Sequence, residues 1–355
     1  MKNQATHYLG LDVHQATIVA TCRNETGGIV LKATVPTEAQ AIVGLVRGLG
    51  PRVRVAFEEG TQAQWLHDLL QPVAEKVIVC NVRGKSELSN KNDDIDSDLL
   101  SERLRTGSLK GVYHGAASVL PLKEMVRNYG NLVEDATRVM QRIKAMYRAR
   151  AIPTPGGGVY SGRQRQIWLD RIKGAGARLR AESLFTQLDS LLPLRSKAKA
   201  AMIAEARRHA AWKILRSIPQ LGPVRVAQII AIVGTPFRFR GKRGFWPYVG
   251  LAVVTRSSAD HEVVAGTIRR RRRAPLTRGL NRNHNHVLKD VFKGAATAGA
   301  YKDGPLKDFY KQCVARGVAE DMALLTLARK IASVALRLWK KGELWDPAKL
   351  TTQTT

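Results

Sequence analysis

The first hundred residues alternate short apolar runs with amphipathic segments. Runs rich in apolar or β-branched residues predict strands, and apolar residues spaced by three and four predict helices. The predicted strands lie at 8–13, 17–22, 29–31, 53–57 and 77–81, and the predicted helices at 38–49, 64–70 and from residue 92 onward. Two or three strands joined by turns, followed by helices that alternate with strands, predict an α/β domain whose mixed sheet carries helices on its faces.

The next segment has a longer period. Apolar residues at 122–147 are spaced alternately by four and three, as in a heptad repeat. The segment from Pro153 to Gly158 interrupts this pattern, and a second helical stretch follows through Trp168 and is expected to end before Pro193. The pattern predicts either an antiparallel coiled-coil hairpin used for dimerisation or an ordinary helix pair packed within one chain.

A third region, from Trp212 to Trp339, is again mostly helical and closes with an amphipathic helix at 322–338. We therefore expect three domains and a tail. They are an α/β domain at 1–112, a helical coiled-coil hairpin at 113–205, a mostly α domain at 206–347 and a tail at 348–355.

Charge divides the chain more sharply than hydropathy does. The 355 residues carry a formal net charge of +29, yet residues 1–110 hold 13 basic and 13 acidic residues, so the remaining 45 basic and 16 acidic residues account for all of it. A polycation of this size attracts polyanions and releases their counterions on binding. No amphipathic anchor accompanies the charge and no apolar run approaches the ~20 residues of a membrane span. We therefore expect a nucleic-acid partner and no membrane.

Cysteine usage and the N-terminus indicate a compartment. Cys22, Cys80 and Cys313 are far apart and form no C-x-x-C pair, so the sequence suggests neither a zinc knuckle nor a disulfide framework. The first fifteen residues lack the apolar run of a signal peptide. A reducing cytoplasm is the expected location.

Four acidic residues in the first domain are the candidate catalytic and metal-binding residues. Asp12 lies inside the first apolar strand, where an unpaired charge is costly. Glu58 ends the strand at 53–57, with Glu59 as the alternative that strand geometry does not exclude, and Asp93 and Asp96 open a predicted helix. Carboxylates from neighbouring strand ends and a nearby helix can hold two Mg²⁺ ions around a phosphate.

A helical projection separates the aspartates of the helix that opens near residue 92. Asp93 and Asp96 fall on the arc of its leucines, which is expected to face the sheet, whereas Asp94 and Asp98 fall toward solvent. Helix capping is the competing interpretation for Asp93 and Asp94. Capping does not explain Asp96, which lies one turn further in, so metal binding is the favoured interpretation.

Three features of the basic region concern nucleic acid. The segment 217–227 resembles one helix-hairpin-helix turn, in which backbone N–H groups at a helix N-terminus meet a phosphate; a turn used only for packing is the alternative. His284 and His286 lack a third ligand of suitable spacing, so we expect polar contacts to nucleic acid or water rather than metal. The candidate phosphate-binding arginines are Arg256, Arg269, Arg270, Arg271, Arg272, Arg273, Arg278 and Arg282.

These motifs together resemble the DEDD transposases of bacterial insertion sequences, of the insertion-sequence-110 type, over nearly the whole chain. The motifs lie at 10–14, 57–60, 91–96, 218–222, 250–251 and 257–258. The resemblance implies a RuvC-like (ribonuclease-H-like) fold in the first domain, which agrees with the predicted order of strands and helices. It also implies that Asp12, Glu58, Asp93 and Asp96 are Mg²⁺ ligands, and it favours Glu58 over Glu59.

The same resemblance implies a serine nucleophile, which falls on Ser258, with Ser257 as the alternative because Ala259 stands where the family has glycine. It further implies DNA substrates (donor and target), a guide RNA from the same element, a homo-oligomer (dimer or tetramer) and a place at the bacterial nucleoid. Two other functions are weighed against it. One is a RuvC-like, structure-specific nuclease that uses water instead of serine, and the other is a non-enzymatic nucleic-acid-binding protein. An actin-like ATPase leaves the charge of +29 unexplained.

Overall fold

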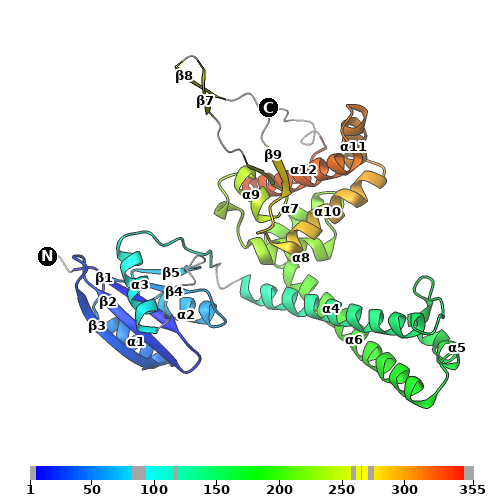
Figure 1. Ribbon diagram of the computed structural model, residues 1–355, viewed down its shortest axis with the longest axis horizontal. Helices are drawn as coiled ribbons and strands as arrows, with labels where there is room; N and C mark the ends of the chain where they lie inside the picture. The colour runs from blue at the N-terminus through cyan, green and yellow to red at the C-terminus, as the bar shows by residue number, and fades with distance from the viewer. Residues whose placement is uncertain are drawn as a thin grey trace. The chain divides into compact units, whose positions relative to one another are not determined.

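The computed structural model describes residues 5–81, 93–114, 119–256, 261–264, 266–270 and 276–347. The chain forms two compact units, Met1–Ala117 and Ser118–Thr355, and each is described by itself. Figure 1 shows a sheet with short helices in the first unit, and mostly helices in the second.

The first unit is built on a mixed sheet. Its strands and helices, in chain order, are β1 (His7–Val13), β2 (Thr17–Arg23), β3 (Ile29–Pro36), α1 (Ala39–Gly48), β4 (Val53–Glu58), α2 (Ala63–Leu70), β5 (Lys76–Cys80) and α3 (Asp93–Arg105). The strand order is β3-β2-β1-β4-β5, and β1 pairs with β2 antiparallel and with β4 parallel. The predicted mixed sheet is confirmed, and its arrangement is compatible with a ribonuclease-H-like fold.

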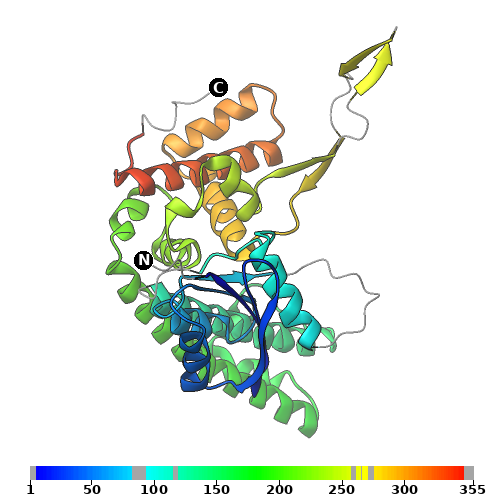
Figure 2. The same cartoon turned by 90° about the vertical axis from the view of Figure 1, so that its left-hand side faces the viewer.

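Alternation along the strands decides which helix covers which face. Successive strand residues point to opposite faces, and Leu9 and Leu11 of β1 belong to a buried cluster with Ile42 of α1 and Leu66 of α2. Gly10, between the two leucines, faces α3 instead. Helices α1 and α2 therefore cover one face of the sheet and α3 covers the other, as Figure 2 shows.

The second unit is mostly helical, as predicted. Its helices are α4 (Leu120–Arg148), α5 (Arg165–Asp170), α6 (Ala175–Arg207), α7 (Ala211–Ser217), α8 (Pro223–Val233), α9 (Lys242–Tyr248), α10 (His286–Tyr301), α11 (Pro305–Ala315) and α12 (Glu320–Lys341). Two small sheets, which the sequence analysis did not anticipate, pair β6 (Val253–Arg256) with β9 (Leu276–Leu280) and β7 (His261–Val264) with β8 (Thr267–Arg270). Within the described residues, no helix combines the length and the apolar character needed to cross a membrane.

The heptad segment forms one helix, α4, which lies along α6 of the same chain (Figure 1). Ile143 and Tyr147 of α4 are buried in one cluster with Phe185 and Leu188 of α6. The apolar seam is therefore covered within the chain, as in the second of the two interpretations, and dimerisation through this hairpin stays a prediction.

The expected end of the second helical stretch before Pro193 is wrong. Pro193 lies inside α6, which continues to Arg207. Proline removes one intrahelical hydrogen bond, but the following turns bury Met202 and Ala206 in the same cluster as Leu122 of α4 and the helices α7 to α12. The burial of these apolar side chains holds the helix together beyond the proline.

Candidate functional site

Asp12 and Glu58 occupy equivalent places on neighbouring parallel strands. Gly10 of β1 is in register with Ala56 of β4, so Asp12 and Glu58, each two residues further on, lie at the same end of the sheet. A residue two positions from Gly10 shares its face, and Gly10 faces α3. Both carboxylates therefore belong to the face of the sheet that α3 covers.

Gly10 determines how closely α3 approaches this face. A Cβ at Gly10 would lie 2.2 Å from the Ser97 carbonyl oxygen and 2.5 Å from the Ser101 backbone nitrogen. Ser97 and Ser101 are fully buried, and the Ser97 hydroxyl lies 2.9 Å from the hydroxyl of Thr21 on β2. Helix and strand thus meet at backbone distance, which only glycine on the strand and small residues on the helix allow.

The contacts along α3 fix its direction. Ser97 lies beside Gly10 and Thr21, whereas Ser101, one turn later, accepts a hydrogen bond from Arg23 at 3.2 Å. In the β1–β2 pairing Thr21 is opposite Gly10, and Arg23 is further from Asp12. The helix therefore begins at the end of the sheet that carries Asp12 and Glu58, and its first turn brings Asp96 and the backbone of Asp93 to that end.

The predicted face of α3 needs one correction. The sheet-facing arc consists of Ser97, Leu100, Ser101 and Leu104, all of them buried. Asp98 does not face solvent as expected: its carboxylate accepts a hydrogen bond of 2.7 Å from Arg23, and its side chain is 33% exposed. The arc is centred on the serines because the close approach at Gly10 leaves no room for leucine there. Asp96 flanks it on the other side and is half-buried.

The environments of Glu58 and Glu59 differ. The Glu59 carboxylate lies 3.1 Å from Nε2 of His114, whose ring stacks on His67 with 5.2 Å between centroids. Glu58 pairs with Cys80 of β5, and burial and then the nearby Glu58 charge raise the pKa of the Cys80 thiol to about 11. Glu59 is thus held by a histidine on the opposite side of the strand end, which supports Glu58 as the site residue.

The carboxylates fit a hard divalent cation in their chemistry. Oxygen ligands are those that Mg²⁺ takes in proteins, and Asp12, Glu58 and Asp96 supply them at one end of one face. The Asp12 carboxylate lies 3.3 Å from Nε2 of His14. In the described part of the chain, no three carboxylate, imidazole or thiol groups are arranged as a metal site. The Asp93 side chain lies outside the described side chains.

Several predicted residues of the second unit cannot be placed. Ser257, Ser258 and the arginines from 271 to 273 lie outside the described residues. Arg256 ends β6, and Arg278 lies on β9, its partner strand. Arg269 and Arg270 end β8, where the side chain of Arg269 is exposed, and Arg282 is exposed after β9.

His284 packs closely against a glycine of the second unit. Its ring packs on Gly250, so closely that a Cβ there would lie 2.5 Å from it, and both buried ring nitrogens have no hydrogen-bond partner among the described residues. Gly250 accepts this contact with a φ of +69°, which is unfavourable for other residues. His284 therefore packs against the segment that leads into β6, and its polar contacts to nucleic acid or water stay a prediction.

The residues that seat α3 were missed at the sequence level. They are Gly10, Thr21, Arg23, Ser97 and Ser101. A glycine in the middle of an apolar strand indicates a close backbone approach, and two serines four residues apart lie on one side of a helix. Read together, these signals could have indicated the contact.

Comparison with known proteins indicates the family of this chain. A family model described as "Transposase", of the DEDD type of IS110, matches residues 9–149, and the model of the "Transposase IS116/IS110/IS902 family" matches residues 212–311. The two cover about two thirds of the chain. The chain is also 30% identical over 142 residues to the "Insertion element IS116 uncharacterized 44.8 kDa protein" of Streptomyces clavuligerus.

That match covers 40% of this chain and 32% of the relative, so the chain spans about a third of the length of the curated relative it matches. The match to the first family model includes the four acidic residues on β1, β4 and α3, and the match to the second runs from α7 into α11. With both models in chain order and a curated relative from an insertion element, the chain belongs to the transposases of the IS110 type.

Proposed function

We propose that this transposase cleaves and exchanges DNA strands in a Mg²⁺-dependent reaction that passes through a serine-linked intermediate. The observation that carries the proposal is the placement of Asp12 and Glu58 at one end and on one face of the sheet, where α3 begins. The alternative in which the acids only cap helices and pair with cations does not account for two carboxylates on neighbouring strands at this position.

Asp12, Glu58, Asp93 and Asp96 would hold the metal, most simply as two ions. Bound there, Mg²⁺ would polarise the scissile phosphate and stabilise the entering and leaving oxygens. The protein's part is to fix the ligands: the sheet register holds Asp12 level with Glu58, and the seat of α3 on Gly10 holds Asp96 at the same end. His114 keeps Glu59 apart from this set.

Ser258 would supply the nucleophile. Its hydroxyl oxygen attacks the phosphorus of one phosphodiester and gives up its proton, while the deoxyribose oxygen on the other side of the phosphorus leaves and takes up a proton. The product is a phosphoserine ester. A hydroxyl of another strand can then attack that phosphorus and release Ser258, so the strand is rejoined without an external source of energy. A hydroxyl needs activation to act in this way, and Arg256 or the strip Arg269–Arg273 would neutralise the developing charge.

The basic unit would hold the nucleic acids. Residues beyond 110 contain 45 basic and 16 acidic residues, enough to neutralise many phosphates. The proposal includes DNA as donor and target, a guide RNA from the same element, and a dimer or tetramer of the chain.

The test is to trap the covalent intermediate. Purified protein is incubated with Mg²⁺ and a nicked DNA substrate, with the RNA that co-purifies with it, and the modified peptide is mapped by mass spectrometry. We expect the adduct on Ser258, its loss in Ser258→Ala with nucleic-acid binding retained, and its persistence in Ser257→Ala. An adduct on Ser257 moves the nucleophile by one residue. Cleavage without any adduct overturns the serine mechanism in favour of a nuclease that uses water.

A further inference from the structure

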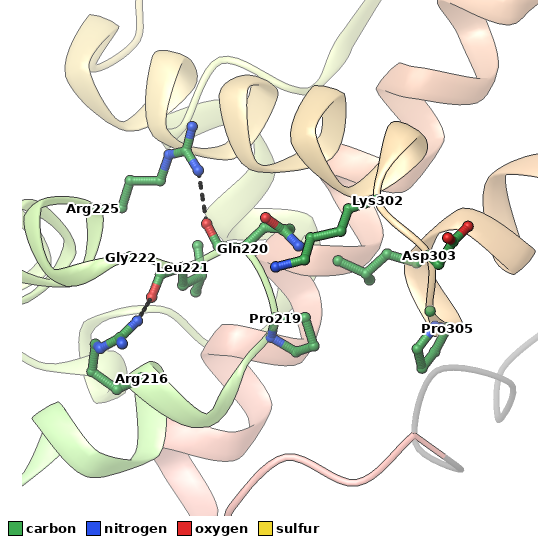
Figure 3. A pocket seen from close by; sticks show the side chains of 11 residues that line it. Arg216, Pro219, Gln220, Leu221, Gly222, Arg225, Lys302, Asp303 and Pro305 are labelled. Atoms are coloured by element: carbon green, nitrogen blue, oxygen red, sulfur yellow. Dashed lines mark hydrogen bonds between the residues drawn. The ribbon is translucent and has the colours of Figure 1, made fainter.

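A hollow of about 460 Å³ lies where two helix junctions of the second unit meet (Figure 3). One wall is the turn between α7 and α8, at 218–222, and the other is the turn between α10 and α11, at 302–304. The two turns are about eighty residues apart in sequence, so the hollow exists only through the packing of these helices.

The lining is cationic. Arg216, Arg225 and Lys302 line the hollow, and Figure 3 shows the Lys302 side chain extending from the end of α10 toward the turn that holds Gln220. Asp303 is the acidic residue of the lining, and its carboxylate accepts a hydrogen bond of 2.7 Å from Lys307. The three cations therefore exceed the opposing charge, which is itself paired.

The arginines also occupy backbone carbonyl oxygens of the turn, which are hydrogen-bond acceptors. One guanidinium nitrogen of Arg225 donates to the Gln220 carbonyl at 2.8 Å, and one of Arg216 donates to the Leu221 carbonyl at 2.5 Å. These bonds hold Gln220 at a φ of +65°, a conformation that favours glycine. Each guanidinium keeps further N–H groups beyond the one that it uses here. With its carbonyls occupied, the turn presents hydrogen-bond donors and positive charge.

The N-termini of α8 and α11 add further hydrogen-bond donors and positive charge to the hollow. Gly222 and Gly304 are the N-cap residues of α8 and α11, and each is followed by proline. Among the described residues, neither helix start has a side-chain capping hydrogen bond at its N-cap. Uncapped helix starts carry free N–H groups and a partial positive charge. A glycine cap leaves these groups open to a ligand.

A second hollow of about 400 Å³ adjoins the first. It shares Gly222 and Arg225 with it and adds Lys199 of α6. The cations thus continue across the start of α8 in both directions, which suits an anionic polymer better than a single small anion.

We propose that the hollow between α8 and α11 binds one phosphodiester of a nucleic-acid backbone, with contacts to phosphate oxygens and none to bases. The inference deepens the proposed function and rests on it, because it names where the basic unit grips its nucleic acid. Lys302 and the free N–H groups of Arg216 and Arg225 are the donors, and they fix the position of the strand without reading its sequence.

A matched pair of variants at Gly222 tests the proposal. A Cβ at Gly222 meets no atom of the described residues within 4 Å, so Gly222→Asp and Gly222→Asn both fit, and both residues cap helices well. They differ in charge alone. Both variants should unfold at or above the wild-type temperature, whereas Gly222→Asp should bind nucleic acid roughly tenfold more weakly than Gly222→Asn, the loss of about one charge-assisted contact.

Binding is measured by fluorescence anisotropy on the full chain, with a duplex DNA and a single-stranded RNA of equal length as probes. A loss confined to DNA assigns the phosphodiester to DNA, a loss confined to RNA assigns it to RNA, and either result supports the site. Equal affinity of the two Gly222 variants for both probes overturns it. If the wild type itself binds neither probe, both the phosphodiester site and the proposed function fail. If the wild type binds the probes and the two Gly222 variants bind equally well, only the phosphodiester site fails.

A second measurement uses salt. Lys302→Ala should lower the slope of log affinity against log salt by about one, the expectation for one lost phosphate contact. Lys293→Ala is the control, because Lys293 is an exposed lysine of the same helix that does not line the hollow. Equal slopes for Lys302→Ala and wild type would contradict a phosphate contact at Lys302.

Discussion

The two units of this protein differ in both charge and construction. Residues 1–110 hold equal numbers of basic and acidic residues, while the rest of the chain holds 45 basic and 16 acidic ones. The first unit is a mixed sheet that brings acidic residues to one end, and the second is a set of helices whose junctions carry cations. A site for a cation must limit positive charge around it, whereas a surface for polyanions must gather it. Because the acidic site and the basic surface lie in different parts of the chain, one protein can bind both cations and polyanions.

The largest expected effect comes from the acidic end of the first unit. Asp12→Asn or Glu58→Gln should lower the rate of DNA cleavage at least about a hundredfold, since metal-ion stabilisation contributes several kcal/mol to such reactions. Binding of nucleic acid should persist. Glu59→Gln is the control, because Glu59 lies against His114. An inactive Glu59→Gln beside an active Glu58→Gln would exchange their roles.

The next effect tests the division of charge. A fragment of residues 118–355 should bind DNA and RNA with steep salt dependence, while residues 1–117 should bind weakly. With six to ten phosphate contacts, affinity should fall roughly 10³- to 10⁵-fold between about 50 and 200 mM salt. Filter binding of the two fragments at several salt concentrations measures this. Comparable affinities of the two fragments at moderate salt would contradict the assignment of nucleic-acid binding to the second unit.

A smaller effect concerns the seat of α3. Gly10→Ala should destabilise the protein by about 1–3 kcal/mol, because a Cβ would lie 2.2 Å from the Ser97 carbonyl oxygen and the helix must move away. Gly44→Ala, at an exposed site of α1 with no atom within 4 Å, should instead stabilise by roughly 0.5–1 kcal/mol. Chemical denaturation of the wild type and both variants measures their free energies of unfolding. Similar changes in both would show that α3 is not seated on Gly10.

The smallest effect lies in the hairpin of the second unit. Two hydrogen bonds of 2.7 and 2.8 Å from Arg165 lower the pKa of Asp189 below its usual range. The stabilisation is therefore present above the unfolded-state pKa of about 3.9 and is lost as the pH falls through the lower, folded-state value. Asp189→Asn should cost less than about 1 kcal/mol near neutral pH, because the Asp189 side chain is 55% exposed.

Thermal unfolding of wild type and Asp189→Asn across pH measures this. The difference between the two proteins should shrink as the solution becomes acidic. A difference that stays constant from neutral to acidic pH would show that packing, and not the charge of Asp189, holds the hairpin at this point.

Much of the first unit could be predicted from the sequence. Periodicity located its strands and helices, and the position of Asp12 inside an apolar strand marked it as unusual. The orientation of α3 could not be predicted in the same way. The projection took leucines as the centre of the buried face, but the contact with Gly10 moved that centre to Ser97 and Ser101 and placed Asp98 against Arg23. Helical periodicity says which residues share a side and nothing about how close the neighbour comes.

In the second unit the sequence predicted the mostly helical character, the helix at 122–147, the closing helix at 322–338 and the turn within 217–227. It misjudged Pro193 because the cost of a proline is local, while the burial of Met202 and Ala206 that outweighs it depends on helices far along the chain. The hollow at Gly222 could not be predicted from the sequence either, since its second wall comes from a turn about eighty residues later.

The sequence by itself determined three properties of the units. They are the hydrophobic periodicity of the strands and helices, the order of the acidic residues and the separation of charge between the units. Those properties are local or additive, so they can be read along the chain. Only the tertiary structure decided that Asp12 and Glu58 share an end and a face, that Glu59 lies against His114, and that Lys302 meets Arg225 across a hollow. Each of these depends on strand register or helix packing, which join residues that are distant in sequence and carry no signal in the residues between them.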